Sequence, residues 1–235
     1  MNSSDSLRSL EALMNEFFHD STSNDRKRQI EVILNEFSKQ DNCWEQCLQY
    51  LSQTDNEYTL MYCLSVLENH ILLKWHTLGP EKSDKRLSIW SYLLTSNESS
   101  PQFVRNKASK LLVTIGRIDW PNSYPDFMQN ILDLLQSKNT MSLALVLLNT
   151  TLEELTQPRD DVCAQRKAEL NKHLVSEIPN ILLSLTNLME LILDKHCNFL
   201  TATPPPSPSQ SPNSESNPSL NKGLNKLFCL KFYFN

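Results

Sequence analysis

Pairs of amphipathic helices that recur about every forty residues are the feature that most restricts the fold of this chain. The second helix of each pair is predicted to begin near residues 24, 56, 101 and 140, so successive starts are 32, 45 and 39 residues apart. Irregular spacing of this size is typical of stacked two-helix repeats. The chain contains only three glycines, whereas average usage would give roughly sixteen in a chain of this length. The sequence therefore predicts an all-α fold.

Each helix pair leaves one apolar face uncovered, and a neighbouring pair must cover it. The segment from about Asp55 to Trp75 shows this most clearly, because apolar residues surround most of the helix. Such a helix must touch neighbours on several sides. Stacking of these pairs predicts an α-solenoid of about five HEAT-type repeats, right-handed and curved, with the second helices on the concave side. We expect Leu67 and Leu112 in its core.

Residues 101–127, PQFVRNKASKLLVTIGRIDWPNSYPDF, are predicted to form a helical hairpin with a tight corner. Pro101 suits the first turn of a helix, and the segment Asp119 to Pro121 ends it because proline cannot continue a helix. One face of this helix is apolar, and the opposite face is polar with a cationic bias. Trp75 and Trp120 lie at helix ends, where we expect them to pack as core residues.

The carboxyl-terminal third is predicted to change character along its length. Two further helices are expected between residues 160 and 197, the second with Pro179 in its first turn. The solenoid is therefore assigned to residues 1–200. Residues 201–222 are rich in proline and serine and carry too little apolar surface to offset the entropy cost of ordering, so a disordered linker is expected.

Residues 223–235, GLNKLFCLKFYFN, differ from everything before them. Four aromatic residues and three leucines in so short a tail cannot cover themselves. An alternative carboxyl terminus and an artefact of gene modelling are the favoured explanations, and an added docking strand is the third. The preceding linker also contains three candidate phosphorylation sites, each directly before a proline: Thr203, Ser207 and Ser211.

The sequence lacks any residue pattern with a catalytic mechanism, which argues against an enzyme. Three isolated glycines cannot form a phosphate-binding loop or a nucleophile elbow. The five histidines and six cysteines lack zinc-site spacing, so we expect no metal or other cofactor, and we expect the cysteines to be small buried core residues. A net charge of -5 without a long basic run argues against nucleic-acid binding. The absence of a signal peptide or a membrane-length apolar run favours a soluble, intracellular protein.

Several strings in the chain resemble a known family. FVRNK, LLVTIGRIDWP and YPDF occur between residues 103 and 127, and SLRSLEALMNEFFHDSTSNDRKRQIE and YTLMYCLSVLENHILLKW precede them. LNTTLEELTQPRDD and TATPPPSPS follow. Together they resemble the exportins of the importin-β superfamily over about residues 5–210, with residues 25–95 most typical of the importin-β amino-terminal domain. Members of this kind are several times longer, so an amino-terminal fragment or a truncated product is expected.

The resemblance implies a nuclear export receptor present in both nucleus and cytoplasm. Receptors of this superfamily bind the small GTPase Ran in its GTP form through their amino-terminal repeats, and exportins take up cargo together with it. The implied cargo is actin with profilin, although this chain lacks most of the arch that would enclose cargo. The alternatives are a passive HEAT-repeat scaffold or competitor without a transport cycle, or a non-functional truncated product. A nucleotide-dependent interaction would distinguish a receptor from a scaffold.

Helical phase places eight polar residues on the predicted concave side, as candidates for contact with Ran-GTP. They lie on three of the second helices and are Glu68, Asn69, Asn106, Lys110, Thr114, Arg117, Asn149 and Glu153. Asn69, Asn106 and Arg117 also match the family's motifs. These three are equally well explained by hydrogen bonds between repeats, because buried polar side chains need partners.

Overall fold

The computed structural model describes residues 3–96, 100–156 and 162–201, and over these residues the chain is helical without any strand, as predicted. These described residues fall into two compact units, one up to Ile178 and one from Pro179. The elements in chain order are α1 (Ser3–Phe18), α2 (Asn24–Ser38), α3 (Cys43–Leu51), α4 (Glu57–Lys74), η1 (Trp75–Thr77), α5 (Glu81–Ser96), α6 (Gln102–Asp119), α7 (Phe127–Asp133), η2 (Leu134–Gln136), α8 (Met141–Thr156) and α9 (Ala164–Thr201).

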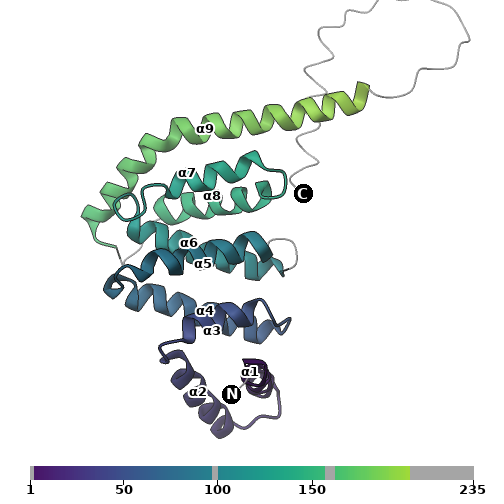
Figure 1. Ribbon diagram of the computed structural model, residues 1–235, viewed down its shortest axis with the longest axis vertical. Coiled ribbons are helices and arrows are strands. Elements are labelled where there is room, and N and C mark those ends of the chain that lie inside the picture. The colour runs from purple at the N-terminus through teal and green to yellow at the C-terminus, as the bar shows by residue number, and fades with distance from the viewer. Residues whose placement is uncertain (1–2, 97–99, 157–161, 202–235) are drawn as a thin grey trace, which may run out of the picture. The chain divides into compact units, whose positions relative to one another are not determined.

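Helices α1 to α8 form successive pairs within the first unit (Figure 1). The second members begin at residues 24, 57, 102 and 141, so the predicted spacing of a helical-repeat solenoid is confirmed. Local capping explains two of these starts. The Ser23 hydroxyl accepts a hydrogen bond from the backbone N–H of Arg26 at 3.3 Å, and Oδ1 of Asn56 accepts one from the backbone N–H of Thr59 at 2.9 Å. Both satisfy a donor that the first turn of a helix leaves unpaired.

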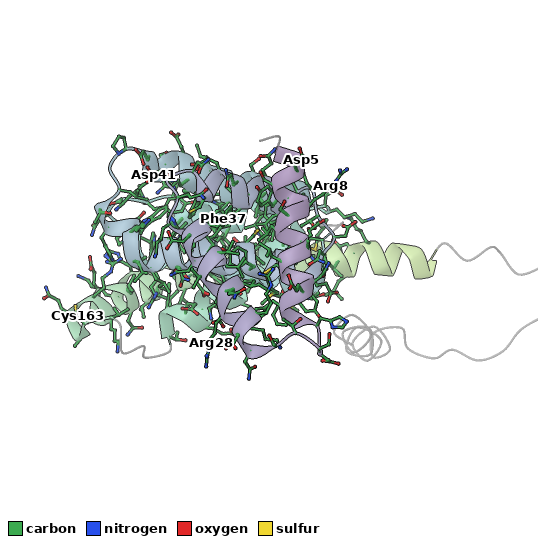
Figure 2. All side chains as sticks on the ribbon, turned by 90° about the horizontal axis from the view of Figure 1, so that it is seen from below. Asp5, Arg8, Arg28, Phe37, Asp41 and Cys163 are labelled. Carbon is green, nitrogen blue, oxygen red and sulfur yellow. The ribbon has the colours of Figure 1, made fainter. Side chains whose placement is uncertain are left out.

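The first pair shows how each repeat is built. Figure 2 shows α1 and α2 alongside one another, with Asp5 near the start of α1 at the opposite end of the pair from Arg28 near the start of α2. The two helices therefore run antiparallel. Arg26 joins them, since its guanidinium donates to both carboxylate oxygens of Glu16, at 2.7 and 2.9 Å. This hydrogen-bonded pair lowers the pKa of Glu16 and raises that of Arg26.

Helices α4, α6 and α8 form one layer of the first unit. Helix α6 packs against α4 and against α8, while α3, α5 and α7 each pack on their own partner. Leu67 on α4 and Leu112 on α6 are both fully buried, which confirms their predicted place in the core. The curvature of the solenoid, its hand and its concave side remain predictions.

The corner after α6 is fixed by a buried carboxylate. Trp75 and Trp120 are buried, as predicted. Nε1 of Trp75 donates a hydrogen bond to Oδ2 of Asp119 at 2.9 Å. Nζ of Lys82 lies 3.7 Å from Oδ1 of the same side chain, and Nη1 of Arg86 lies 3.9 Å from Oδ2. Asp119, the last residue of α6, therefore links α6 to the end of the α3–α4 repeat through Trp75. It links α6 to helix α5 through Lys82 and Arg86.

An arginine from α9 caps the carboxyl end of α6. Nη2 of Arg166 donates to the backbone carbonyl of Arg117 at 3.0 Å, to that of Ile118 at 3.2 Å, and to that of Trp120. The final carbonyls of a helix have no partner within the helix, so the guanidinium supplies one. Glu169 holds Arg166 in place through a 2.6 Å ion pair, and this hydrogen bond lowers the pKa of Glu169.

Gly116 permits the close packing of α6 on α7. A Cβ atom at this position would lie 2.4 to 2.7 Å from three ring carbons of Phe127, which is itself fully buried. We therefore expect Gly116→Ala to lower the free energy of unfolding by about 1 to 3 kcal/mol, because the ring must shift within a packed core. Urea denaturation followed by circular dichroism measures this. Gly79→Ala is the control, since a Cβ there meets nothing within 4 Å; equal effects at the two sites would contradict the packing argument.

The prediction of two helices between residues 160 and 197 is wrong. Helix α9 runs continuously from Ala164 to Thr201 with Pro179 inside it. Proline removes one hydrogen bond and crowds the carbonyl four residues earlier. Leucine, glutamate and lysine on both sides favour the helix, and the helix continues past Pro179. Residues 201–222 and 223–235, predicted as linker and tail, lie outside the described residues apart from Thr201, as do the phosphorylation candidates Thr203, Ser207 and Ser211.

Candidate protein-binding face

The exposed side of the α4, α6 and α8 layer is the candidate binding surface. The first helices cover the other side of this layer, so the exposed residues of α4, α6 and α8 share one side. We call this surface the open face. Two ion pairs bridge its helices: Glu68 of α4 pairs with Lys107 of α6, and Nζ of Lys110 on α6 lies 3.8 Å from Oε1 of Glu154 on α8.

Most of the predicted contact residues lie on or beside the open face. Asn69, Asn106, Asn149 and Glu153 are exposed, and Glu68 and Lys110 are half-buried in the ion pairs that join neighbouring helices. Nδ2 of Asn149 donates to Oε1 of Glu153 at 2.8 Å, which orients both side chains along α8. The open face therefore presents amides and charges of both signs.

The predicted placement of Thr114 and Arg117 on an exposed face is wrong. Their exposed fractions are only 3% and 4%. The Thr114 hydroxyl donates to the backbone carbonyl of Lys110 at 2.8 Å, within its own helix. The backbone carbonyl of Arg117 accepts a hydrogen bond from Arg166 of α9. The prediction from helical phase assumes that one side of α6 is exposed along its whole length. The carboxyl-terminal half of α6 is buried on that side too.

Apolar residues also contribute to the open face, and helical phase did not single them out as binding residues. Tyr58, Met61 and Leu72 on α4 are exposed large apolar side chains, and Leu145 lies on α8. The sequence signal for these exposed residues is that apolar side chains surround almost the whole of α4. The sequence analysis assigns all of them to the core. Exposed aromatic and methionine side chains are enriched at protein interfaces, so this patch strengthens the candidate surface.

A small polar cavity opens between α6 and α8 within the same layer. Its volume is about 50 Å³, and it is lined by Gln102, Arg105, Asn106, Ser109, Ser142, Leu143 and Val146. Among the described residues, Oγ of the fully buried Ser109 has no hydrogen-bond partner. A cavity of this size accommodates one water molecule or the tip of a small polar side chain.

The cysteines and histidines form no reactive centre in the described part of the chain. Sγ of Cys43 lies 2.9 Å from Nε2 of His70. Burial raises the pKa of the Cys43 thiol and lowers the pKa of His70, so both groups favour their neutral forms, and a neutral thiol is a poor nucleophile or metal ligand. No group of three or more potential metal ligands occurs among the described residues.

The prediction that the cysteines are buried core residues is confirmed for three of them. Cys43, Cys47 and Cys63 are buried, whereas Cys163 is exposed, so the prediction is wrong there. Cys163 lies just before α9. The side chains of Cys197 and Cys229 lie outside the described residues. None of the helices in the described ranges has the length and apolar content to cross a membrane.

Two family matches cover most of the chain. Residues 30–114 match the importin-beta N-terminal domain, and residues 101–216 match the exportin 1-like protein family. The chain is 46% identical over 205 residues to exportin-6-A of Xenopus laevis, and 46% identical over 207 residues to exportin-6 of Homo sapiens. Each alignment covers 87% of this chain and 18% of the relative. The chain resembles the amino-terminal part of exportin-6.

The likeness to exportin-6 extends to a distant relative, since exportin-6 of Dictyostelium discoideum is 26% identical over 219 residues, 85% of this chain and 21% of that protein. The chain thus spans about a fifth of the length of these exportin-6 relatives. Both matched families are nuclear transport receptors rather than enzymes, and the matches support a nuclear export receptor family for this chain. Residues 101–114, which include most of α6 at the centre of the open face, lie within both matches. Residues 223–235 lie beyond both.

Proposed function

We propose that this chain acts in nuclear protein export by binding the small GTPase Ran in its GTP form through the open face. The observation that carries the proposal is the arrangement of α4, α6 and α8 side by side, with exposed amides and charges and two inter-helix ion pairs within one surface. The importin-beta N-terminal match covers α4 and most of α6, which supports the same surface. The proposed contacts are Glu68, Asn69, Asn106, Lys110, Asn149 and Glu153.

The proposed cycle follows from linkage between two ligands. When an exportin binds Ran-GTP and cargo together, each ligand raises the affinity of the exportin for the other ligand by the same factor. Hydrolysis of GTP removes one ligand and releases the other. The proposed cargo is actin with profilin, and the proposed locations are the nucleus and the cytoplasm, where loading and release take place.

Calorimetry with the full chain tests this proposal. Ran loaded with a non-hydrolysable GTP analogue, and separately with GDP, is titrated into the chain after its helicity has been checked by circular dichroism. We expect binding to the GTP-analogue form and little or none to the GDP form. A second titration with actin–profilin present should show tighter Ran binding. Equal binding to both nucleotide forms, or no binding by a folded sample, would favour the passive scaffold instead.

Lys110→Ala is expected to weaken binding of GTP-loaded Ran roughly tenfold, because a cation at the centre of an interface contributes strongly to affinity. Lys110 lies on α6 between the flanking helices and pairs with Glu154, which is 8% exposed. Calorimetry measures the change in Kd. Lys39→Ala removes an equally charged, exposed side chain at the end of α2, a helix outside the α4, α6 and α8 layer. The same loss with both variants would indicate a general charge effect and count against the open face as the site.

A further inference from the structure

An apolar stripe on α9 lies exposed within the second unit. Leu182, Leu185 and Met189 follow one another at spacings of three and four residues, so they share one side of the helix. Leu182 and Met189 are exposed, and so is Leu183 beside them at 62%. Ile181 and Leu188 are buried on a different side. Leu185, between Leu182 and Met189, is half-buried. Exposed large apolar residues gathered on one side of a helix are typical of a surface that binds another segment.

An acidic row runs next to this stripe. Its members are Glu190 and Asp194, which are exposed and four residues apart on one side of α9, in line with Leu183 beside the stripe. A segment that covered the stripe and reached this row would therefore need apolar side chains together with positive charge. The chain contains one such segment outside the described residues.

Residues 223–235, which we call the tail, have this composition. The tail holds three leucines, four aromatic residues and two lysines, Lys226 and Lys231, and it has no acidic side chain. It also lies beyond both family matches, so the exportin pattern does not account for it. Its charge is opposite to that of the acidic row, and its apolar residues match the chemistry of the stripe.

The length of the connecting segment suits this contact. Residues 202–222 join the end of α9 to the tail. A linker of 21 residues has an end-to-end distance of about 25 Å as a flexible coil and about 65 Å as an extended polyproline chain. The 19 residues of helix between Leu182 and Thr201 span about 28 Å. The span lies within this range, so the linker is long enough to bring the tail to the stripe of the same molecule.

We propose that the tail, residues 223–235, docks on the apolar stripe of α9 in the same molecule, with Lys226 and Lys231 against Glu190 and Asp194. Intramolecular docking covers the stripe at any protein concentration, whereas a second copy would need a high concentration. The stripe lies in the second unit, whereas the open face lies in the first.

Hydrogen–deuterium exchange of the full chain, compared with a chain ending at Lys222, tests the proposal. We expect amides of residues 182–193 to exchange at least roughly tenfold faster without the tail, because an uncovered helix opens more often. Amides of α6 provide the internal control and should exchange at the same rate in both chains. Unchanged exchange in residues 182–193 would overturn the proposal.

Charge-swap variants keep the test specific if the shortened chain does not fold. Lys226→Glu with Lys231→Glu should remove the protection, and adding Glu190→Lys with Asp194→Lys should restore it. Lys226→Arg with Lys231→Arg is the matched control that retains the charge. Protection that disappears on dilution would assign the stripe to a second copy, and protection that requires added anionic lipid vesicles would assign the tail to a membrane surface. Either result would overturn the proposal.

Discussion

Replacing Asp119 with alanine is expected to lower the free energy of unfolding by about 3 to 5 kcal/mol, because the remaining partners of a buried ion pair lose their compensation. The Asp119 side chain is only 3% exposed and accepts a hydrogen bond from Trp75. Lys82 and Arg86 approach the same carboxylate and are themselves largely buried. The variant leaves an indole N–H without its acceptor and two cations near one another. Urea denaturation followed by far-ultraviolet circular dichroism measures the loss.

Two companion variants separate the causes at Asp119. Asp119→Asn retains an oxygen that can accept from Trp75 but removes the charge, so its loss measures the ion pairs with Lys82 and Arg86. Glu31→Ala removes an exposed carboxylate from α2 and should change stability by no more than about 0.5 kcal/mol. A similar small change for Asp119→Ala would show that the buried carboxylate does not hold the corner.

Leu112→Ala is expected to destabilise the fold by about 2 to 5 kcal/mol, since it leaves a cavity in a core that relaxes only partly. Leu112 is fully buried on α6, the helix that packs against both α4 and α8. The loss of packing at Leu112 should therefore also destabilise α4 and α8. Denaturation curves give the free energy, and hydrogen exchange of α4 and α8 amides should rise in the same variant.

The matched control for Leu112 is another leucine at an exposed position. Leu73 near the end of α4 is 77% exposed, so Leu73→Ala leaves no cavity and should change stability by about 0.5 kcal/mol or less. Equal effects at Leu112 and Leu73 would contradict the structure of the α6 core. A greater loss of stability for Leu112→Ala, with unchanged hydrogen exchange of the α4 and α8 amides, would show that the destabilisation is confined to α6.

The helix pairs were predictable because their signals are local. Asn56 caps a helix start through its own side chain, and an apolar stripe of period 3.6 identifies the buried side of α6. The second helices consequently begin at or within one residue of their expected positions. The prediction at Pro179 is wrong because it considers only the local free-energy cost of proline within a helix. The continuity of α9 depends instead on the helix-forming residues on both sides of Pro179.

The candidate site was only partly predictable because burial is not a local property. Asn106 is exposed as helical phase predicts, but Arg117, on nearly the same side of α6, is buried. The residue that approaches the end of α6 is Arg166, which lies 49 positions further along the chain, and periodicity within α6 carries no information about it. The exposed apolar side chains of α4 were missed for the converse reason, since apolar residues were all assigned to the core.

The cap that Arg166 places on α6 has a consequence for synthesis of the chain. Arg166 emerges 46 residues after Trp120, whose carbonyl it binds. At 5 to 20 residues per second, a ribosome takes about 2 to 9 s to add that stretch. During this interval the carbonyls of Arg117, Ile118 and Trp120 lack the guanidinium that later binds them, although the helix and its hairpin corner have already been translated. The third repeat therefore reaches its final hydrogen bonding only when the start of α9 arrives, so translation speed over residues 121–166 sets how long its end stays open.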